Sequence, residues 1–233
     1  MATKGGPNIV TDGLVLYLDS VNPKSYTGSG TVVNDLSISQ NNANLLNGAS
    51  ISNTTEQSII TDGIDDQVVV PSPNLNFNSE LTLECWVKIE HTGNYGGLFR
   101  QSNGLGGFGL SIRGSDGFII HYIGNPSSAV GGWWVIGSFS NLLQGPSDWH
   151  HLCSVSNLAI SGNTNRWFYI DGELRSNRTQ SFTSTQVPYN SNDILLINNG
   201  FGGKLLLPKI YNKALSAEEV LQNYNATKSR FNL

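Results

Sequence analysis

Short apolar runs, regularly interrupted by turn-forming residues, constrain the fold of this chain most strongly. Runs of about five to eight apolar or alternating residues recur between clusters of Gly, Asn, Asp, Pro and Ser, a pattern typical of a sandwich or barrel. The spacing leaves no room for crossover helices, so the sheets should be antiparallel. The predicted strands cover residues 14–18, 58–60, 67–70, 81–89, 97–100, 108–112, 118–123, 133–139, 149–155, 166–170, 193–197 and 205–211.

The chain shows neither an internal repeat nor a linker, which favours one large all-β domain. We expect residues 1–12 to form an N-terminal arm and residues 13–233 to form the domain. Residues 22–55 are Asn-rich and poorly periodic, which predicts a loop with one or two short strands. The turns should include Asp171-Gly172, because both residue types tolerate positive φ.

Neutral side chains carry the polarity of this chain. Asn, Ser, Thr and Gly supply 94 of the 233 residues, whereas 13% are charged and the net charge is −4. Such a surface does not attract phosphates, so we expect no nucleic acid partner. No apolar run reaches the roughly 18 residues that a membrane span needs, so we expect no membrane insertion. The N-terminus lacks the charged and apolar regions of a signal peptide.

One helix is predicted near the C-terminus. Ser216 and Glu219 have the spacing of a capping box, in which each side chain satisfies a free backbone N–H of the other residue. The helix should end near Asn225. The residues expected to share its buried face are Ala217, Val220, Leu221 and Tyr224.

Seven segments, in order along nearly the whole chain, carry family motifs. They are GLVLYLDS (13–20), DLS followed by NNANLLNG (35–48), DGIDDQVVVP (62–71), LTLECWVK (81–88), WHHLC (149–153), WFYIDGEL (167–174) and IYNKALSAEEV (210–220). Together they resemble the laminin G-like branch of the concanavalin A-like lectin/glucanase superfamily. This resemblance implies a jelly-roll sandwich of two antiparallel sheets that binds ligands on one face or rim.

The two cysteines are too few for a disulfide scaffold or a zinc site. Cys85 in T-x-x-C, Cys153 in W-x-x-x-C and the later Phe201-Gly202-Gly203 are similar to the pentraxin-like branch, which implies an intrachain disulfide. Period-two counting places each cysteine on one face of its strand, and the thiols are neighbours if those faces meet. The alternative is two buried free thiols that act as small hydrophobes.

A calcium site is predicted at Asp65 and Asp66. They lie in a tight loop before a strand and offer hard oxygens, and many laminin G-like domains hold a structural Ca²⁺ with such groups. The alternative is that both are ordinary turn residues. A calcium site of the pentraxin type is not expected, because the chain has neutral Asn198 and Asn199 before Phe201.

The sequence does not supply the groups that an enzyme of this superfamily needs. Its retaining glycosidases carry carboxylates at alternate positions of one strand, roughly 5 Å apart. Glu80 and Glu84 match the outer positions only, and we expect Glu80 to lie in a turn before the strand. His150 and His151 are adjacent and should point to opposite faces. We therefore predict no enzymatic activity.

A carbohydrate site would combine an aromatic platform with planar amides. The first candidate is Trp133-Trp134, because alternation sends one indole outward. The second consists of Asn94 and Tyr95 in a Gly-rich loop, with Arg100 next to it. The alternative is that both tryptophans pack at a sandwich edge or a protein interface. The tryptophans expected to support the core are Trp86, Trp149 and Trp167.

The segments GLVLYLDS, VNPKSYTGSGT and YNKALSAEEVLQNYNATKSRF are also similar to virion-associated proteins of tailed bacteriophages. This resemblance implies a non-enzymatic virion protein, a capsid decoration subunit that contacts other virion proteins. Such a protein would be assembled in the host bacterial cytoplasm and exposed on the particle surface. The alternative function is a carbohydrate-binding adhesin that recognises host surface glycans.

Overall fold

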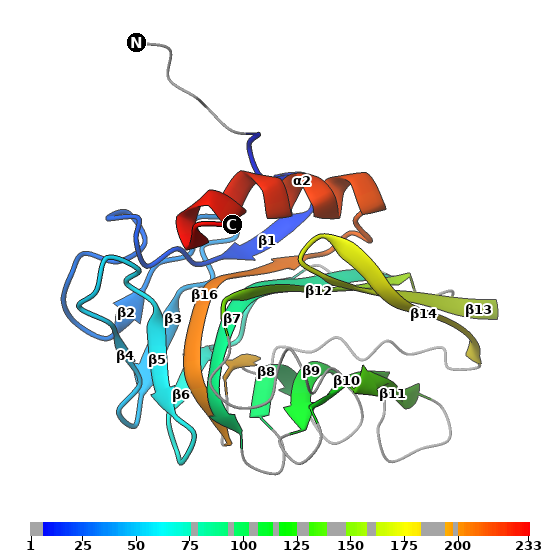
Figure 1. The fold of residues 1–233 in the computed structure, drawn as a ribbon, viewed down its shortest axis with the longest axis horizontal. Coiled ribbons are helices and arrows are strands. Elements are labelled where there is room, and N and C mark those ends of the chain that lie inside the picture. Colours follow the sequence, from blue (N-terminus) through cyan, green and yellow to red (C-terminus); the bar gives the residue numbers. More distant parts are fainter. Residues whose placement is uncertain are drawn as a thin grey trace.

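The computed structural model contains two antiparallel sheets and a helix that lies outside one of them (Figure 1). It describes residues 7–75, 79–92, 96–102, 107–113, 117–124, 131–138, 148–157, 162–182, 194–197 and 200–233. The predicted all-β class, with antiparallel sheets and one short C-terminal helix, is confirmed. In this described part of the chain, no helix has the length and apolarity to cross a membrane.

The helix-covered sheet is the one that carries the helix on its outer face. Its strand order is β14-β13-β12-β7-β16-β5-β4, and β1 pairs with β16 outside this path. Its strands are β1 (Leu14–Tyr17), β4 (Ser50–Ile51), β5 (Ile59–Asp62), β7 (Glu80–Thr92), β12 (His150–Asn157), β13 (Gly162–Ile170), β14 (Glu173–Phe182) and β16 (Phe201–Tyr211).

The second sheet has the order β11-β10-β9-β8-β15-β6-β3-β2. Its strands are β2 (Val32–Val33), β3 (Ala43–Leu46), β6 (Gln67–Val70), β8 (Gly96–Ser102), β9 (Gly107–Arg113), β10 (Phe118–Gly124), β11 (Gly131–Ser138) and β15 (Ile194–Leu196). Every predicted strand overlaps an observed one, whereas β14 was not predicted, and residues 22–55, where one or two short strands were expected, contain three, β2, β3 and β4. The expected turn at Asp171-Gly172 has positive φ at both residues, as their chemistry predicts.

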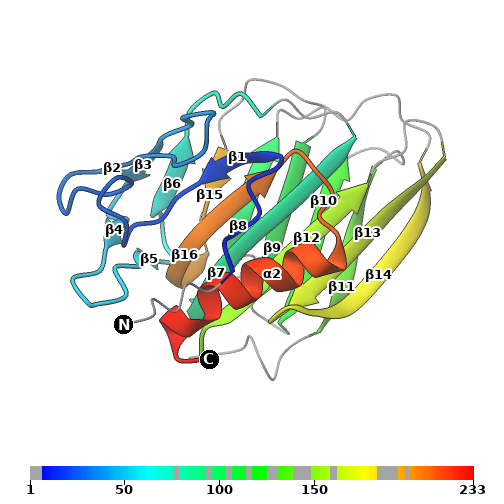
Figure 2. The ribbon, with the colours of Figure 1, turned by 90° about the horizontal axis from the view of Figure 1, so that it is seen from above.

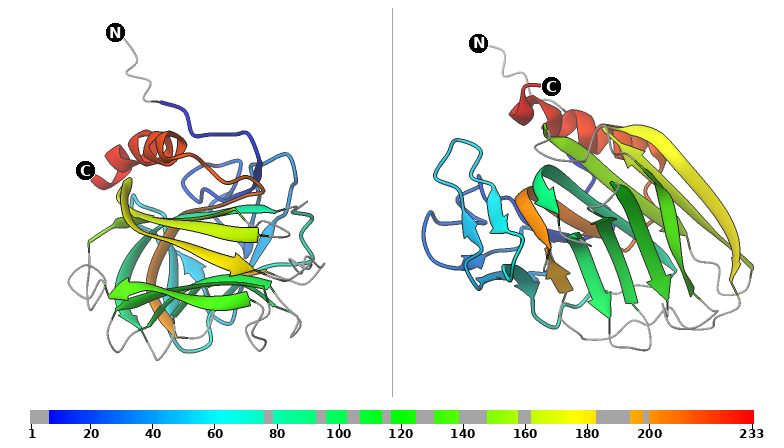
Figure 3. Two further views of the ribbon diagram at one scale, coloured as in Figure 1. Left: turned by 90° about the vertical axis from the view of Figure 1, so that its right-hand side faces the viewer. Right: turned by 60° about the horizontal axis from the view of Figure 1, so that its bottom comes forward.

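The main core lies between the two layers, which Figure 3 shows from two further directions. Alternation along β7 sends Leu83 and Val87 inward, where neither side chain is exposed. The second sheet sends Leu110 and Ile112 of β9 into the same cluster. A smaller cluster on the opposite face of the helix-covered sheet contains Trp86, Trp149, Leu206 and Leu207.

Helix α2 (Ala217–Thr227) lies across the helix-covered sheet and continues into the 3-10 turn η1 (Lys228–Phe231; Figure 2). The predicted capping box of Ser216 and Glu219 is present. The predicted buried face is only partly right, since Ala217 and Leu221 are exposed. The helix is turned so that two polar residues are buried beside Val220. These are Asn223 and Thr227, whose side chains bond buried groups of the sheet.

Of the two alternatives for Cys85 and Cys153, the structure has the buried free thiols and not the disulfide. Strands β7 and β12 do pair, but their register places Cys85 opposite Leu152 and Cys153 opposite Glu84. Because consecutive residues of a strand point to opposite faces, one thiol joins the core between the sheets and the other faces α2. Both cysteines are free and buried, and burial raises the pKa of each thiol.

Candidate functional site

Glu84 of β7 is sealed between the helix-covered sheet and α2. Its Oε1 lies 2.6 Å from Nζ of Lys209 and 3.1 Å from Nε2 of His151, and none of these side chains is exposed. Burial alone would raise the pKa of Glu84, but the charges of Lys209 and His151 hold it at about 2. This carboxylate is therefore the anion of a buried ion pair.

The same carboxylate ties α2 and the N-terminal segment to the sheet. Nδ2 of Asn223 donates to Oε2 of Glu84 at 2.7 Å and contacts the Tyr211 hydroxyl at 2.9 Å. The Tyr211 hydroxyl donates to the carbonyl of Val10, whose N–H donates to Oδ1 of Asn223. Every polar atom in this chain of contacts has a structural partner, as buried polar groups require.

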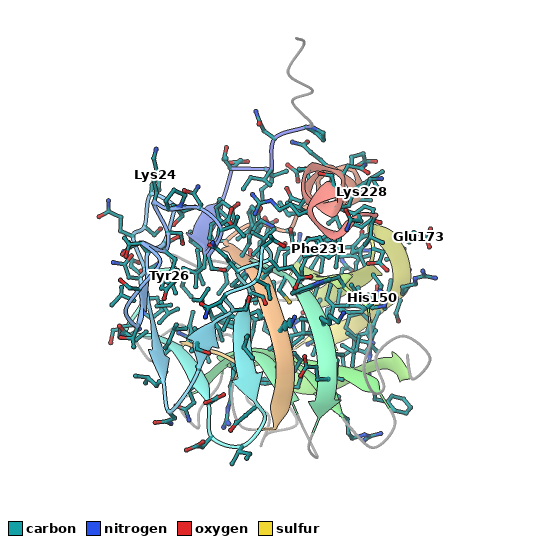
Figure 4. The ribbon with its side chains drawn as sticks, turned by 60° about the vertical axis from the view of Figure 1, so that its left-hand side comes forward. Lys24, Tyr26, His150, Glu173, Lys228 and Phe231 are labelled. Atoms are coloured by element: carbon teal, nitrogen blue, oxygen red, sulfur yellow. The ribbon has the colours of Figure 1, made fainter. Side chains whose placement is uncertain are left out.

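Aromatic side chains pack together under α2, beside the buried ion pair of Glu84. Trp86 stacks on Phe231 with ring centroids 4.1 Å apart, and its Nε1 donates to Oγ1 of Thr227 at 2.9 Å. Trp149 lies 4.9 Å from the same phenylalanine ring. Figure 4 shows Phe231 below the turn that carries Lys228. Trp86 and Trp149 thus support packing, as predicted.

His150 and His151 follow the predicted alternation. His150 leaves the sealed region, and its Nδ1 lies 2.8 Å from Oδ2 of Asp171. The two imidazoles thus have different carboxylate partners, Asp171 and Glu84, and do not converge on one centre. This arrangement does not have the geometry of a shared metal site or of a nucleophile with its base.

Asp62, Asp65 and Asp66 form a carboxylate cluster between β5 and β6. One oxygen from each residue lies within 4.8 Å of the others, so the predicted pair has a third member, Asp62. Burial raises the pKa of Asp66, and the charges of the other two carboxylates add to this rise. The N–H of Asp62 donates to Oδ2 of Asp66 at 2.7 Å. The remaining oxygens are hard ligands of the kind that Ca²⁺ prefers.

Trp134 is the inward-facing member of the predicted Trp133-Trp134 pair. Its indole is 3% exposed within the main core, with its ring 6.3 Å from that of His121. The side chain of Trp133, and Asn94 and Tyr95 entirely, lie outside the described part of the chain. Arg100 is exposed on β8 of the second sheet.

Trp167 instead lies at the outer surface, where the sequence predicted a residue that supports the core. Alternation along β13 sends Arg166 and Phe168 inward, while Trp167 and Tyr169 face outward beside the start of α2. Trp167 is half-buried and packs its inner edge on the cluster that contains Val220. We call the hollow beside it the Trp167 pocket.

The Trp167 pocket has a volume of about 340 Å³. Its walls come from β7, β12, β13 and the segment that leads into α2. The lining residues are Glu80, Asn157, Trp167, Tyr169, Ala214, Leu215, Ser216 and Ala217. Glu80 is the first residue of β7, so the turn predicted at this position is wrong.

Two polar side chains on the floor of the pocket hold each other in place. Nδ2 of Asn157 donates to Oε1 of Glu80 at 3.2 Å, and the N–H of Ala214 donates to Oε2 at 3.1 Å. A carboxylate oxygen accepts about two hydrogen bonds, so each Glu80 oxygen keeps capacity for a ligand. The carbonyl oxygen of Asn157 can also accept.

Three amide side chains share the sheet face of the Trp167 indole. The register places Asn177 of β14 opposite Trp167, and places Asn157 of β12 opposite Asn165 of β13. Residues opposite one another, or two apart along a strand, are neighbours on one face. Asn165, two residues before Trp167, therefore extends the polar surface from the pocket along β13.

Comparison with known proteins identifies the family to which this fold belongs. Residues 62–221 match the family model described as the concanavalin A-like lectin/glucanases superfamily. No curated protein sequence matches the chain significantly. The predicted likeness to phage virion proteins is not supported by these comparisons, so the capsid role stays a prediction.

Solved structures of clostridial toxin domains share the fold. The binding domain of botulinum neurotoxin DC, in complex with rat synaptotagmin II, has 16% identity and a TM-score of 0.69. That match covers 93% of this chain and 52% of the other chain. A botulinum neurotoxin type C structure, whose description states that cell entry depends on two ganglioside molecules, has 16% identity, a TM-score of 0.70 and the same coverage.

The binding domain of Paraclostridial Mosquitocidal Protein 1 is similar to the same degree. It has 16% identity and a TM-score of 0.70, over 92% of this chain and 52% of that chain. The present chain thus spans about half the length of these structures, and at such identity the likeness concerns the fold alone. With its jelly-roll sandwich and a family match over most of its length, the chain belongs to the concanavalin A-like lectin/glucanase superfamily.

Proposed function

We propose that this protein is a non-catalytic, glycan-binding domain of the adhesin type, and that the Trp167 pocket is its binding site. The observation that carries the proposal is a partly exposed indole fixed on a strand beside a carboxylate and an amide, with the amides of Asn165 and Asn177 on the same face of the sheet. The likeness of the fold to toxin binding domains, one of them described as interacting with gangliosides, supports the same function class.

The chemistry of the pocket suits a sugar ring. The apolar C–H face of a pyranose stacks on an aromatic ring, while its hydroxyl groups need planar acceptors and donors at the edge. Trp167 offers the ring, and Glu80 and Asn157 offer oxygens whose positions are fixed by their mutual hydrogen bond. Because these groups lie on strands, little conformational entropy is lost when a ligand binds.

The arrangement of carboxylates supports binding without hydrolysis. A glycosidase needs two carboxyl groups facing one sugar, about 5 to 9.5 Å apart. Glu84, the nearest acidic partner of Glu80 on β7, is fully buried in its ion pair with Lys209. Of the described residues that line the pocket, Glu80 is the one with a carboxylate.

A glycan array compares the wild-type protein with Trp167→Ala. We expect selective binding by the wild type and loss of that binding in the variant, because truncation removes the stacking surface. Ile38→Ala is the matched control, since Ile38 is an apolar residue with 97% exposure that lies outside the pocket lining. A positive array that is unchanged by Trp167→Ala would place the binding site elsewhere.

A structural calcium ion at Asp62, Asp65 and Asp66 is a further proposal. The three carboxylates lie close enough to share one cation, and burial of Asp66 together with the neighbouring charges disfavours its ionised form. A divalent ion at this position would relieve that repulsion. Thermal melting with Ca²⁺ and with EDTA tests the proposal.

We also keep exposure on a bacteriophage particle, with contacts to other virion proteins, as a proposal. This proposal rests on the resemblance of three sequence segments to virion-associated proteins of tailed bacteriophages. A glycan-binding domain on a particle surface would help adsorption to a host cell, so this location is compatible with the Trp167 pocket. The number of copies per particle tests the location: hundreds of copies support a capsid decoration, and a handful at the tail contradict it.

A further inference from the structure

Negative charge dominates the surroundings of the Trp167 pocket. Glu80 is the charged member of the described lining, and Glu218 and Glu219 follow the lining residue Ala217 in the first turn of α2. Burial raises the pKa of Tyr169, another lining residue, and the charge of Glu218 adds to this rise. Glu218 thus lies close enough to the lining to act on a charged ligand.

Lys213, next to the lining residue Ala214, is already paired with two carboxylates. Nζ of Lys213 lies 2.9 Å from Oδ2 of Asp12 and 2.6 Å from Oε1 of Glu219. Lys213 therefore has one positive charge between two carboxylates and has no net charge to offer an acidic ligand. An anion entering the pocket would meet the charges of Glu80 and Glu218 without a compensating partner.

The start of α2 does not act as an anion site either. Free N–H groups at a helix N-terminus usually attract anions. Here the N–H of Glu219 donates to Oγ of Ser216 at 3.2 Å, and the N–H of Ser216 donates to Oε2 of Glu219 at 2.9 Å. The carboxylate of Glu218 also accepts from the Ser216 hydroxyl. The positive end of the helix thus faces acidic side chains of its own first turn.

Glu80 and Asn157 present three acceptor oxygens to the pocket. Each oxygen of Glu80 and the carbonyl oxygen of Asn157 can accept a bond from a ligand. A hydroxyl group satisfies such an acceptor by donating its proton. A carboxylate or sulfate group has no proton to donate and would leave the remaining capacity of these partly buried acceptors unused, which weakens binding.

From this balance of charge and hydrogen bonds we infer that the Trp167 pocket selects neutral, hydroxyl-rich sugars and rejects acidic ones. The inference rests on the proposed glycan-binding function and names the class of its ligand. Uronic acids, sialylated glycans and sulfated sugars are the rejected class. The selectivity resides in Glu80, with Glu218 adding to the repulsion.

The test uses matched neutral and acidic probes on one array and in titration. Suitable pairs are lactose with 3′-sialyllactose, gluco-oligosaccharides with their glucuronic acid counterparts, and galactan with galacturonan oligomers. We expect the bound probes to be neutral and each acidic counterpart to bind at least about tenfold more weakly, as for two like charges in a partly buried site. The difference should shrink at high salt.

Glu80→Gln tests the residue that the selectivity depends on. Glutamine keeps the length and one acceptor oxygen but removes the charge, so binding of the acidic probes should rise toward that of the neutral probes. Glu90→Gln is the matched control, because Glu90 is an exposed glutamate of the same strand, ten residues from the pocket. In the control, the ratio of neutral to acidic affinity should not change.

The possible outcomes separate the two proposals. Binding of acidic probes that equals or exceeds binding of neutral ones, and that is lost in Trp167→Ala, overturns the selectivity but leaves the glycan-binding function standing. An unchanged ratio in Glu80→Gln overturns the assignment of the selectivity to Glu80. If no probe of either class binds the folded wild-type protein, the glycan-binding function fails, and the inferred ligand class fails with it.

Discussion

Two glutamates of β7, four residues apart on one face of the strand, have opposite surroundings. Glu84 is fully buried between the sheet and α2, with Lys209, His151 and Asn223 as partners. Glu80 lies where α2 begins and lines an open pocket. The helix, and not the strand, therefore decides which carboxylate is structural and which can meet a ligand. The largest effects on stability should come from changes to the buried Glu84 and its partners.

Lys209→Met should destabilise the protein more than any other change discussed here. It leaves the Glu84 carboxylate buried without its main counter-charge, which costs about 3 to 5 kcal/mol of unfolding free energy. Urea denaturation measures the effect. Lys213→Met is the control, because Lys213 pairs at the surface and its loss should cost less than about 1 kcal/mol. Equal costs for the two variants would show that the buried pair contributes no special stability.

Low pH should destabilise the protein through the same buried ion pair. The pKa of Glu84 is about 2 in the folded protein and ordinarily 4.5, so its contribution to stability is present above pH 4.5 and is lost as the pH falls toward 2. A pKa shift of this size corresponds to a loss of about 3 kcal/mol of unfolding free energy over that pH range. The double variant Glu84→Gln/Lys209→Met removes this component. Its unfolding free energy, measured from pH 5 to pH 2.5, should fall less steeply than that of the wild type.

Much of the fold follows from the sequence because apolar alternation marks the longer strands with one buried face, whereas the short strands β2, β3 and β4 were expected only as part of a loop. Strand β14 lacks that signal. It is the last strand of its sheet, and its described side chains from Glu173 to Thr179 are partly or fully exposed, so no apolar residues are required. The buried face of α2 was misjudged for a related reason. Asn223 is buried because Glu84 and Tyr211 bind it, and hydrophobic periodicity does not detect such a residue.

The site was harder to predict than the fold because exposure depends on which element covers a strand. Trp134 and Trp167 are both tryptophans in alternating strands, yet one belongs to the core and the other lines the pocket. The available signal was the pattern around Trp167, where Asn165 shares its face while Phe168 has the opposite one. The cysteines show the same limit, since strand pairing can be guessed while a shift of one residue in register reverses the faces.

In the Trp167 pocket, Trp167→Ala should cost little unfolding free energy, although we expect it to abolish glycan binding. The indole is half-buried and packs only one edge, so we expect a loss of about 1 to 2 kcal/mol. Trp134→Ala, which empties a site in the core, should cost about 3 to 5 kcal/mol. Denaturation and glycan binding measured on both variants separate the two roles. A large stability loss for Trp167→Ala would mean that the indole is mainly a packing residue.

The smallest effect is expected at the cluster of Asp62, Asp65 and Asp66. This cluster differs from Glu80 and Glu84 because its carboxylates lie close to one another. If the cluster binds Ca²⁺ with a dissociation constant of about 0.1 to 1 mM, then 1 mM Ca²⁺ should add about 0.4 to 1.4 kcal/mol to the unfolding free energy. Melting curves with Ca²⁺ and with EDTA measure this difference, and Asp65→Asn should reduce it. Mg²⁺ at the same concentration is the control, because it favours stricter octahedral geometry. Identical melting in Ca²⁺ and EDTA would leave the aspartates as turn residues, held by bonds such as that from the Asp62 N–H to Asp66.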